Sequence, residues 1–184
     1  MNTGLIGARY AAALFAFAKQ NKADEQVYAE AKKVSESFFR FAQLRPVLEN
    51  PVMLNAEKKK IILLAAGEKV SKTFERFIDL LLKNNREYHL QSIVLKFIDL
   101  YRDQNNIHFG KLTTATVVDE LTEKRMISMV RSETGGTLEI EKEVNPELLG
   151  GFTFEVDFKR WDASVSGQLN SIRKEYTEIN RSIF

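Results

Sequence analysis

Two short runs of alternating apolar residues flank a glycine pair near the C-terminal end of the chain, and this segment restricts the fold more than any other. The apolar positions are Leu138, Ile140 and Val144 before the Asn145-Pro146 break, and Phe152, Phe154, Val156 and Phe158 after the glycines. Such alternation is typical of β-strands, so the segment predicts two strands. Gly150 and Gly151 give the backbone freedom for a bulge or a close chain approach. Taken alone, the segment predicts a β-hairpin.

Helical periodicity fills residues 7–105. Apolar residues recur at three- and four-residue spacing over 7–20, 23–44, 55–66, 71–82 and a last segment carrying Leu90 to Tyr101. Pro46 and Pro51 bracket a short turn of helix. Asn55 is predicted to cap the helix over 55–66, and Gly67 to end it. These helices and their short connections predict an antiparallel six-helix bundle.

The pattern changes after Asn105-Asn106. Residues 111–118 are rich in Thr and Val, as strands are, and 121–134 return to a helical pattern with Leu121, Met126, Met129 and Val130 as its apolar members. Gly135-Gly136 ends that helix, and Asp162 or Ser164 is expected to cap a final one. The predicted fold class is mainly α: a six-helix bundle over residues 1–106, then a small α+β domain of β-α-β-β-α order over 107–184.

Composition and motifs argue against catalysis. His89 and His108 are the only histidines, there is no cysteine, and no phosphate-binding glycine motif occurs. Glu139, Glu141 and Glu143 alternate on one strand and are interpreted as a solvated face, and the lysines at 58–60 as exposed. We therefore predict a non-catalytic protein with no cofactor and no metal site. The net charge of +2 does not indicate a nucleic-acid-binding protein.

Nothing in the sequence predicts a membrane span. The longest apolar run, Tyr10 to Ala18, is about half of the ~20 residues that a span requires. Ala16-Phe17-Ala18 imitates a signal-peptide cleavage site but lies inside the apolar run, and Arg9 directly abuts that run. The chain is therefore expected to be intracellular and to have no direct membrane insertion.

The first predicted helix is apolar on nearly every side. Tyr10, Leu14 and Phe17 define one face, and Phe15 projects away from that face. A helix of this kind is normally buried all round. Two interpretations stay open: a central core helix, or a helix whose second face is covered by a partner.

Two further apolar positions suggest partner binding. Leu80 lies off the Phe74, Phe77, Ile78 and Leu81 stripe of its helix, and beside a second uncovered helix it would form half of a groove for an amphipathic helix. The final helix carries apolar residues at heptad spacing, which suits either a core face against the small sheet or a partner coiled-coil helix. These residues are Val165, Leu169, Ile172, Tyr176, Ile179 and Ile183.

Four blocks of the chain, in order, carry a resemblance to a known family. They are Arg9-Tyr10-Ala11 with Ala13-Leu14-Phe15, then Leu81-Leu82-Lys83-Asn84-Asn85-Arg86 with Leu90, then 138–155 with its Gly150-Gly151-Phe152, and finally Asp162, Ser164, Gly167 and Leu169. Together they resemble the delta subunit of the F-type ATP synthase, the oligomycin-sensitivity-conferral family, over nearly the whole chain. The chain departs from that pattern at Asn85, where glycine is usual, at Phe154, where an aliphatic residue is typical, and at Asp157.

The resemblance implies a stator subunit that links two parts of a larger complex. The N-terminal bundle would bind N-terminal helices of the alpha subunits of the catalytic head, next to beta subunits, and the C-terminal domain would bind the b-type stalk subunits. The positions that match the family's head-binding surface are Tyr10, Ala13 and Leu80. One copy per hetero-oligomeric complex, peripheral at the cytoplasmic face of a bacterial cell membrane, is expected. In that place the subunit would couple ion transport to ATP synthesis.

A second function class is compatible with the same pattern. A free-standing helical adaptor would use the apolar groove for another amphipathic helix, with no connection to an ATP synthase. A nucleic-acid-binding module is a more distant alternative, because here the aromatic residues fall on core stripes. Groove binding should depend weakly on salt concentration, whereas phosphate binding should fall steeply with it.

Overall fold

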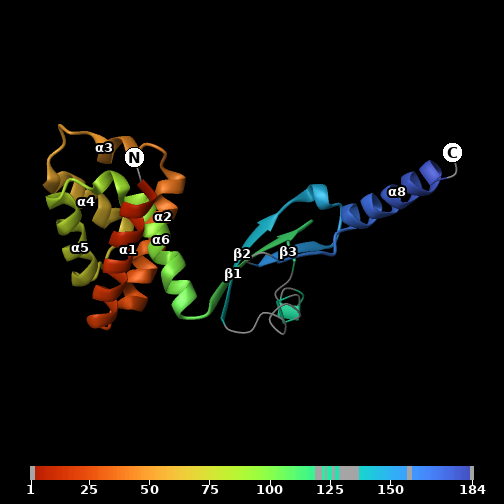
Figure 1. The fold of residues 1–184 in the computed structure, drawn as a ribbon, viewed down its shortest axis with the longest axis horizontal. Helices are drawn as coiled ribbons and strands as arrows, with labels where there is room; N and C mark the ends of the chain where they lie inside the picture. The colour runs from red at the N-terminus through yellow and green to blue at the C-terminus, as the bar shows by residue number, and fades with distance from the viewer. Residues whose placement is uncertain are drawn as a thin grey trace. The chain divides into compact units, whose positions relative to one another are not determined.

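The protein is mainly helical, with a small four-stranded sheet in its C-terminal part (Figure 1). We describe it from a computed structural model that covers residues 3–118, 122, 124–125, 127–128, 137–156 and 159–182, with the backbone alone for residue 3 and for 174–182. The chain divides into two compact units, Met1–Asn105 and Asn106–Phe184. Each unit is described separately.

The first unit consists of α-helices and one short 3-10 helix. Its elements are α1 (Thr3–Gln20), α2 (Asp24–Arg40), α3 (Leu44–Glu49), α4 (Asn55–Ala66), α5 (Lys72–Lys83), η1 (Glu87–His89) and α6 (Leu90–Gln104). Helix α6 packs along both α1 and α2, and α4 packs against α2 and α5. The rings of Tyr28 and Tyr101 stack with centroids 4.2 Å apart where α2 meets α6. Large side chains such as Phe74 and Phe97 are fully buried in this core.

Two helix ends differ from the prediction. Helix α2 ends at Arg40 and not at Leu44, and Phe41, which was expected in the core stripe, is 64% exposed beyond its end. Pro46 lies inside the first turn of α3, where the backbone needs no intrahelical N–H donor. Helix α4 begins at Asn55, but the N-cap is Leu54 and no side chain caps it. Gly67 is the C-cap of α4, as predicted.

Charged and polar side chains lie inside the first unit. Lys58 of α4 pairs with Glu87 of η1 at 2.7 Å, and both side chains are over nine-tenths buried. The prediction that Lys58 is exposed was wrong, because its partner lies far along the sequence. Glu30 of α2 accepts hydrogen bonds from the amide and the hydroxyl of Ser71, and the same hydroxyl caps α5 by accepting from the Phe74 amide. These contacts join α2, α4, α5 and η1.

The second unit contains a mixed sheet followed by a helix. Its elements are β1 (Ile107–Thr114), β2 (Thr137–Val144), the 3-10 helix η2 (Pro146–Leu148), β3 (Phe152–Val156), β4 (Lys159–Asp162) and α8 (Val165–Ser182). The strand order is β2-β1-β3-β4, with β1 parallel to β2 and antiparallel to β3. The apolar residues predicted for the helix over 121–134, its glycine stop and Phe158 lie outside the described residues.

The predicted hairpin is wrong in its pairing, although both strands form. Strand β1 lies between β2 and β3, so the strands on either side of Gly150-Gly151 are not neighbours. Strand β1 also begins earlier than the predicted 111–118, and β4 was not predicted. Period-two alternation identifies a strand and its faces, but it does not say which other strand is its neighbour.

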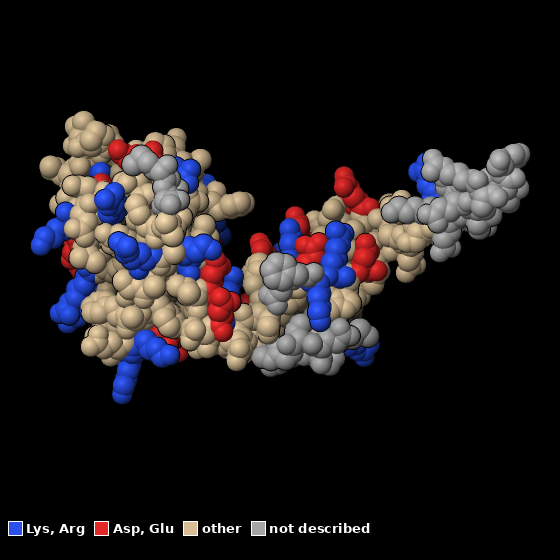
Figure 2. All heavy atoms as spheres, viewed as in Figure 1, with Lys and Arg blue, Asp and Glu red and all other residues tan. Residues whose placement is uncertain are grey.

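The two faces of the sheet differ in polarity. Leu112, Phe154 and Val156 form a buried cluster on one face, with four partly buried residues packed around it: Leu138, Ile140, Phe152 and Trp161. On the other face Lys111 pairs with Glu143 at 2.6 Å, and Glu141 and Glu143 are exposed, as the alternation predicted. Acidic and basic side chains lie side by side over the second unit (Figure 2). The buried apolar cluster therefore lies on the face opposite the Lys111–Glu143 pair.

Candidate functional site

Helix α1 buries a face of small residues. Ala11, Leu14 and Ala18 are fully buried, whereas Tyr10 and Phe17, which were predicted as core with Leu14, are only half-buried. Small side chains let two helices approach closely, and an added Cβ at Gly7 would lie 3.0 Å from the Ser92 hydroxyl of α6. The core face of α1 is therefore the surface that fits against α6.

Phe15 packs against the core of the first unit. Its ring lies 6.3 Å, centroid to centroid, from that of the buried Phe97 of α6, and the side chain is half-buried. The opposite side of α1 carries exposed alanines, among them Ala12, Ala13 and Ala16. The uncovered side of α1 is thus flat and made of small residues.

The three positions predicted for head binding lie on helices that pack against each other, α1 and α5. Ala13 is exposed, Tyr10 is half-buried and Leu80 is 46% exposed. The remaining large residues of α5, Phe74, Phe77, Ile78 and Leu81, are buried as predicted. We call Tyr10, Ala13 and Leu80 the head surface.

Sequence reasoning missed a hollow on the first unit, between α4 and α5. It is lined by Leu63, Leu64, Gly67 and Val70, with Lys60, Glu68 and Glu75 at its edges. Leu64 is 79% exposed. The continuous apolar run from Ile61 to Ala66 could have indicated this surface. One buried face of a helix needs apolar residues only at every third or fourth position, so some residues of the run had to be exposed.

Helix α8 exposes the apolar residues of its described first half. Val165, Leu169 and Ile172 are 42%, 53% and 51% exposed. The side chain of Tyr176, the fourth predicted stalk residue, lies outside the described part, as do those of Ile179 and Ile183. Helix α8 packs against η2, and among the side chains that the structure describes the apolar cluster of the sheet contains none from α8. We call Val165, Leu169 and Ile172 the stalk stripe.

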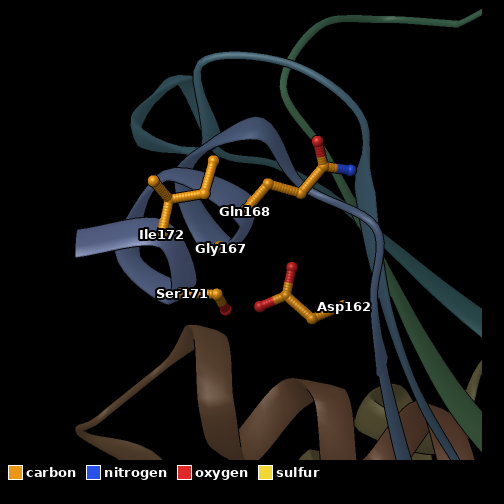
Figure 3. Close-up of a pocket in the computed structure, with 5 residues that line it drawn as sticks. All are labelled: Asp162, Gly167, Gln168, Ser171 and Ile172. Atoms are coloured by element: carbon orange, nitrogen blue, oxygen red, sulfur yellow. The ribbon is translucent and has the colours of Figure 1, made fainter. Parts of the chain in front are cut away.

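A capping arrangement holds the first turn of α8. The Asp162 carboxylate accepts hydrogen bonds from the Ser164 amide at 3.0 Å and hydroxyl at 2.6 Å, and the hydroxyl accepts from the Gly167 amide at 3.0 Å. The bonds from Ser164 lower the pKa of Asp162, since they favour its ionised form. A hollow beside this turn is lined by Asp162, Gly167, Gln168, Ser171 and Ile172 (Figure 3). Both predicted caps, Asp162 and Ser164, therefore take part.

One histidine of the first unit is buried and has a shifted pKa. His89 is 4% exposed at the start of α6, and burial, with the nearby Arg86 charge, lowers its pKa. Among the described residues, no group of three His, Asp or Glu side chains lies close enough to hold a metal ion. No helix within the same residues is long and apolar enough to cross a bilayer.

Comparisons with known proteins match nearly the whole chain. Residues 6–175 match the family model described as ATP synthase delta (OSCP) subunit. The ATP synthase subunit delta of Phocaeicola vulgatus is 41% identical over 184 residues, covering 100% of both chains. That of Bacteroides fragilis is 38% identical, again over 100% of both, and that of Prochlorococcus marinus is 32% identical over 92% of this chain and 94% of its own.

A solved structure has the same fold. A chain of the Toxoplasma gondii mitochondrial ATP synthase hexamer superposes with a TM-score of 0.68 at 19% identity, covering 93% of this chain and 97% of that one. At this identity the likeness concerns the fold alone. Sequence and fold together lead to one conclusion: the chain belongs to the ATP synthase delta (OSCP) family, and is a non-catalytic subunit of the ATP synthase complex.

Proposed function

We propose that the protein is the stator subunit that joins the catalytic head of the ATP synthase to its peripheral stalk. Residues 1–106 bind N-terminal helices of the alpha subunits, beside the beta subunits, and residues 107–184 bind the b-type stalk subunits. One copy acts in each complex, peripheral at the cytoplasmic face of the bacterial membrane. Resisting the torque of the rotor keeps ion flow coupled to ATP synthesis.

The observation that carries the stalk assignment is the exposed stalk stripe. A core helix packed on the sheet would bury Val165, Leu169 and Ile172, yet each of them is more than two-fifths exposed. Their four- and three-residue spacing gives a narrow apolar seam, which fits the side of another helix. The heptad pattern allowed either a core face against the sheet or a partner helix. The exposure of these three residues favours the partner helix.

The head assignment is supported by the exposure of the head surface. Ala13 and Leu80 lie uncovered on two helices that pack together, so a partner helix placed across α1 and α5 would reach both. Covering a few hundred Å² of apolar surface contributes several kcal/mol at roughly 25 cal/mol per Å². The entropy lost on association offsets part of this gain. The flat run of alanines suits close approach of that helix.

Family membership favours this function over a free-standing adaptor. The adaptor hypothesis needs the same apolar surfaces but no ATP synthase, whereas the full-length relatives from bacteria are ATP synthase delta subunits.

The first experiment is a mild-detergent pull-down of the tagged chain from membranes of its own organism, with mass spectrometry of the captured proteins. We expect alpha, beta and b-type subunits together. A preparation that lacks these subunits but contains another helical protein would overturn the proposal.

A further inference from the structure

We infer that Gly150 and Gly151 are positioning residues for stalk binding, because they fix the point and direction at which α8 leaves the sheet. The inference rests on the proposed function, in which α8 contacts the stalk. The glycine pair determines where the stalk stripe lies. Neither glycine needs to touch a partner in this role.

The segment that contains the glycines runs beside the start of α8. The carbonyl of Gly150 accepts a hydrogen bond from the Val165 amide at 3.0 Å, and the carbonyl of Phe152 accepts one from the Ala163 amide at 3.0 Å. Val165 is the first residue of α8 and also the first residue of the stalk stripe. The backbone of the glycine segment therefore holds the helix at the residue where the stripe begins.

This approach leaves no room for side chains at either glycine. Gly151 has a φ of +75°, and an added Cβ would overlap the carbonyl oxygen of Ala163, a backbone atom that cannot turn away. A Cβ at Gly150 would lie 2.9 Å from a methyl carbon of Val165. Residues larger than glycine would push the start of α8 away from β3.

A second set of contacts holds the same turn from the other side. Ser164 is 1% exposed and joins Asp162 to the Gly167 amide through its hydroxyl. Before the glycines, Asn145 accepts a hydrogen bond from the Glu147 amide and shapes η2, against which α8 packs. The direction of α8 is thus set at its root, by η2, the glycine pair and the capping residues.

A small change at this root is enlarged along the helix. Val165 and Ile172 are separated by about 10 Å at ~1.5 Å of rise per residue. A tilt of about 20° at the root would therefore move Ile172 by about 3.5 Å. A displacement of this size would disrupt the packing of the stalk stripe against a partner helix, because packed side chains interlock at the scale of a methyl group. The glycines would then control affinity without contributing contact area.

The test uses stalk affinity and a distance measurement together. The chain contains no cysteine, so spin labels can be placed selectively on cysteines introduced at Glu141 of β2 and Asn170 of α8, both exposed. In the full chain, G151A should shift or broaden the distance distribution between the labels. It should also weaken binding to the soluble part of the b-type stalk subunit by about tenfold, or about 1.4 kcal/mol. G4A, which adds the same methyl group in open space, is the control.

G150A with a compensating change covers the case in which G151A does not fold. The added Cβ at position 150 meets only the Val165 side chain within 4 Å, and V165A would remove the methyl carbon that it approaches. We expect G150A alone to weaken stalk binding, and the G150A/V165A double variant to bind like V165A alone. Additive losses, or wild-type affinity and distances in G150A, would overturn the inference. If the wild-type chain itself fails to bind the stalk fragment, the proposed function fails instead.

Discussion

The first unit buries its largest helix faces inside itself, whereas the second unit leaves Val165, Leu169 and Ile172 of α8 exposed. In the first, α6 is packed between α1 and α2, and even a lysine–glutamate pair, Lys58 and Glu87, is enclosed. In the second, three side chains form the fully buried cluster of the sheet, and α8 contributes none of them. The first unit thus encloses large apolar and even charged side chains, while the second leaves exposed the α8 residues that we propose to bind a partner.

The largest effect is expected from breaking the enclosed ion pair of the first unit. K58M leaves Glu87 buried without its counter-charge, which should lower the free energy of unfolding by about 3–5 kcal/mol. Urea denaturation followed by circular dichroism measures this loss. K58M/E87L should recover most of it, and K60M, which removes an exposed lysine of the same helix, should change little. A K58M midpoint equal to that of the wild type would contradict the account.

The next effect concerns the stalk stripe. L169D places a charge where a partner helix would bury a leucine, so binding to the b-type subunit should weaken by about 30-fold. The free energy of unfolding should change by less than about 0.5 kcal/mol, because Leu169 is already exposed. N170D puts the same side chain on the neighbouring exposed position and is the matched control. Equal losses in both variants would mean that charge on α8, and not the stripe, decides the affinity.

A smaller effect is expected on the first unit's head surface. A13D and L80D should each weaken binding to an alpha-subunit N-terminal peptide by about tenfold while the helical content stays unchanged. Isothermal titration calorimetry of the folded variants measures the affinity. A8D, at an exposed alanine about 140° round the same helix, is the control for A13D. A variant that loses helicity but keeps its affinity in the folded fraction would count against the head surface.

The smallest effects come from pH, and the two units should respond in different ranges. Burial lowers the pKa of His89 below 6.5, so the first unit should have full stability above that pH and lose some of it as the pH falls towards the folded-state pKa. The pKa of Asp162 is held below 3.8 by Ser164, so its contribution to the second unit persists down to that pH and is lost only below it. Amide hydrogen exchange measures the stability of each unit separately, and following it as a function of pH checks both pH ranges. H89Q should remove the first dependence and D162N the second.

Sequence patterns predicted those parts of the fold in which large apolar residues dominate. Phe74, Phe77, Ile78 and Leu81 identified the buried face of α5, and the same stripe identified Leu80 as exposed. The face of α1 was misplaced because Ala11 and Ala18 carry little hydrophobic signal, although their small size is what lets α6 approach. Size complementarity between two helices is not visible in either helix alone.

Long-range pairing was beyond prediction for a related reason. Nothing local in the sequence says that β1 separates β2 from β3, or that Lys58 meets Glu87. For the candidate site, the heptad spacing identified Val165, Leu169 and Ile172 but did not distinguish a sheet from a partner as their cover. Their exposure in the folded unit favours the partner.

In the proposed function one chain joins two partners through two separate surfaces, and a bridging assay measures both contacts in one experiment. The catalytic head complex is immobilised, the chain is added, and capture of the soluble part of the b-type stalk subunit is measured. We expect that capture requires the chain, that L80D lowers the amount of chain bound to the head, and that L169D leaves the chain on the head but lowers the amount of stalk fragment captured. Stalk capture that is unaffected by both substitutions would contradict the proposed function.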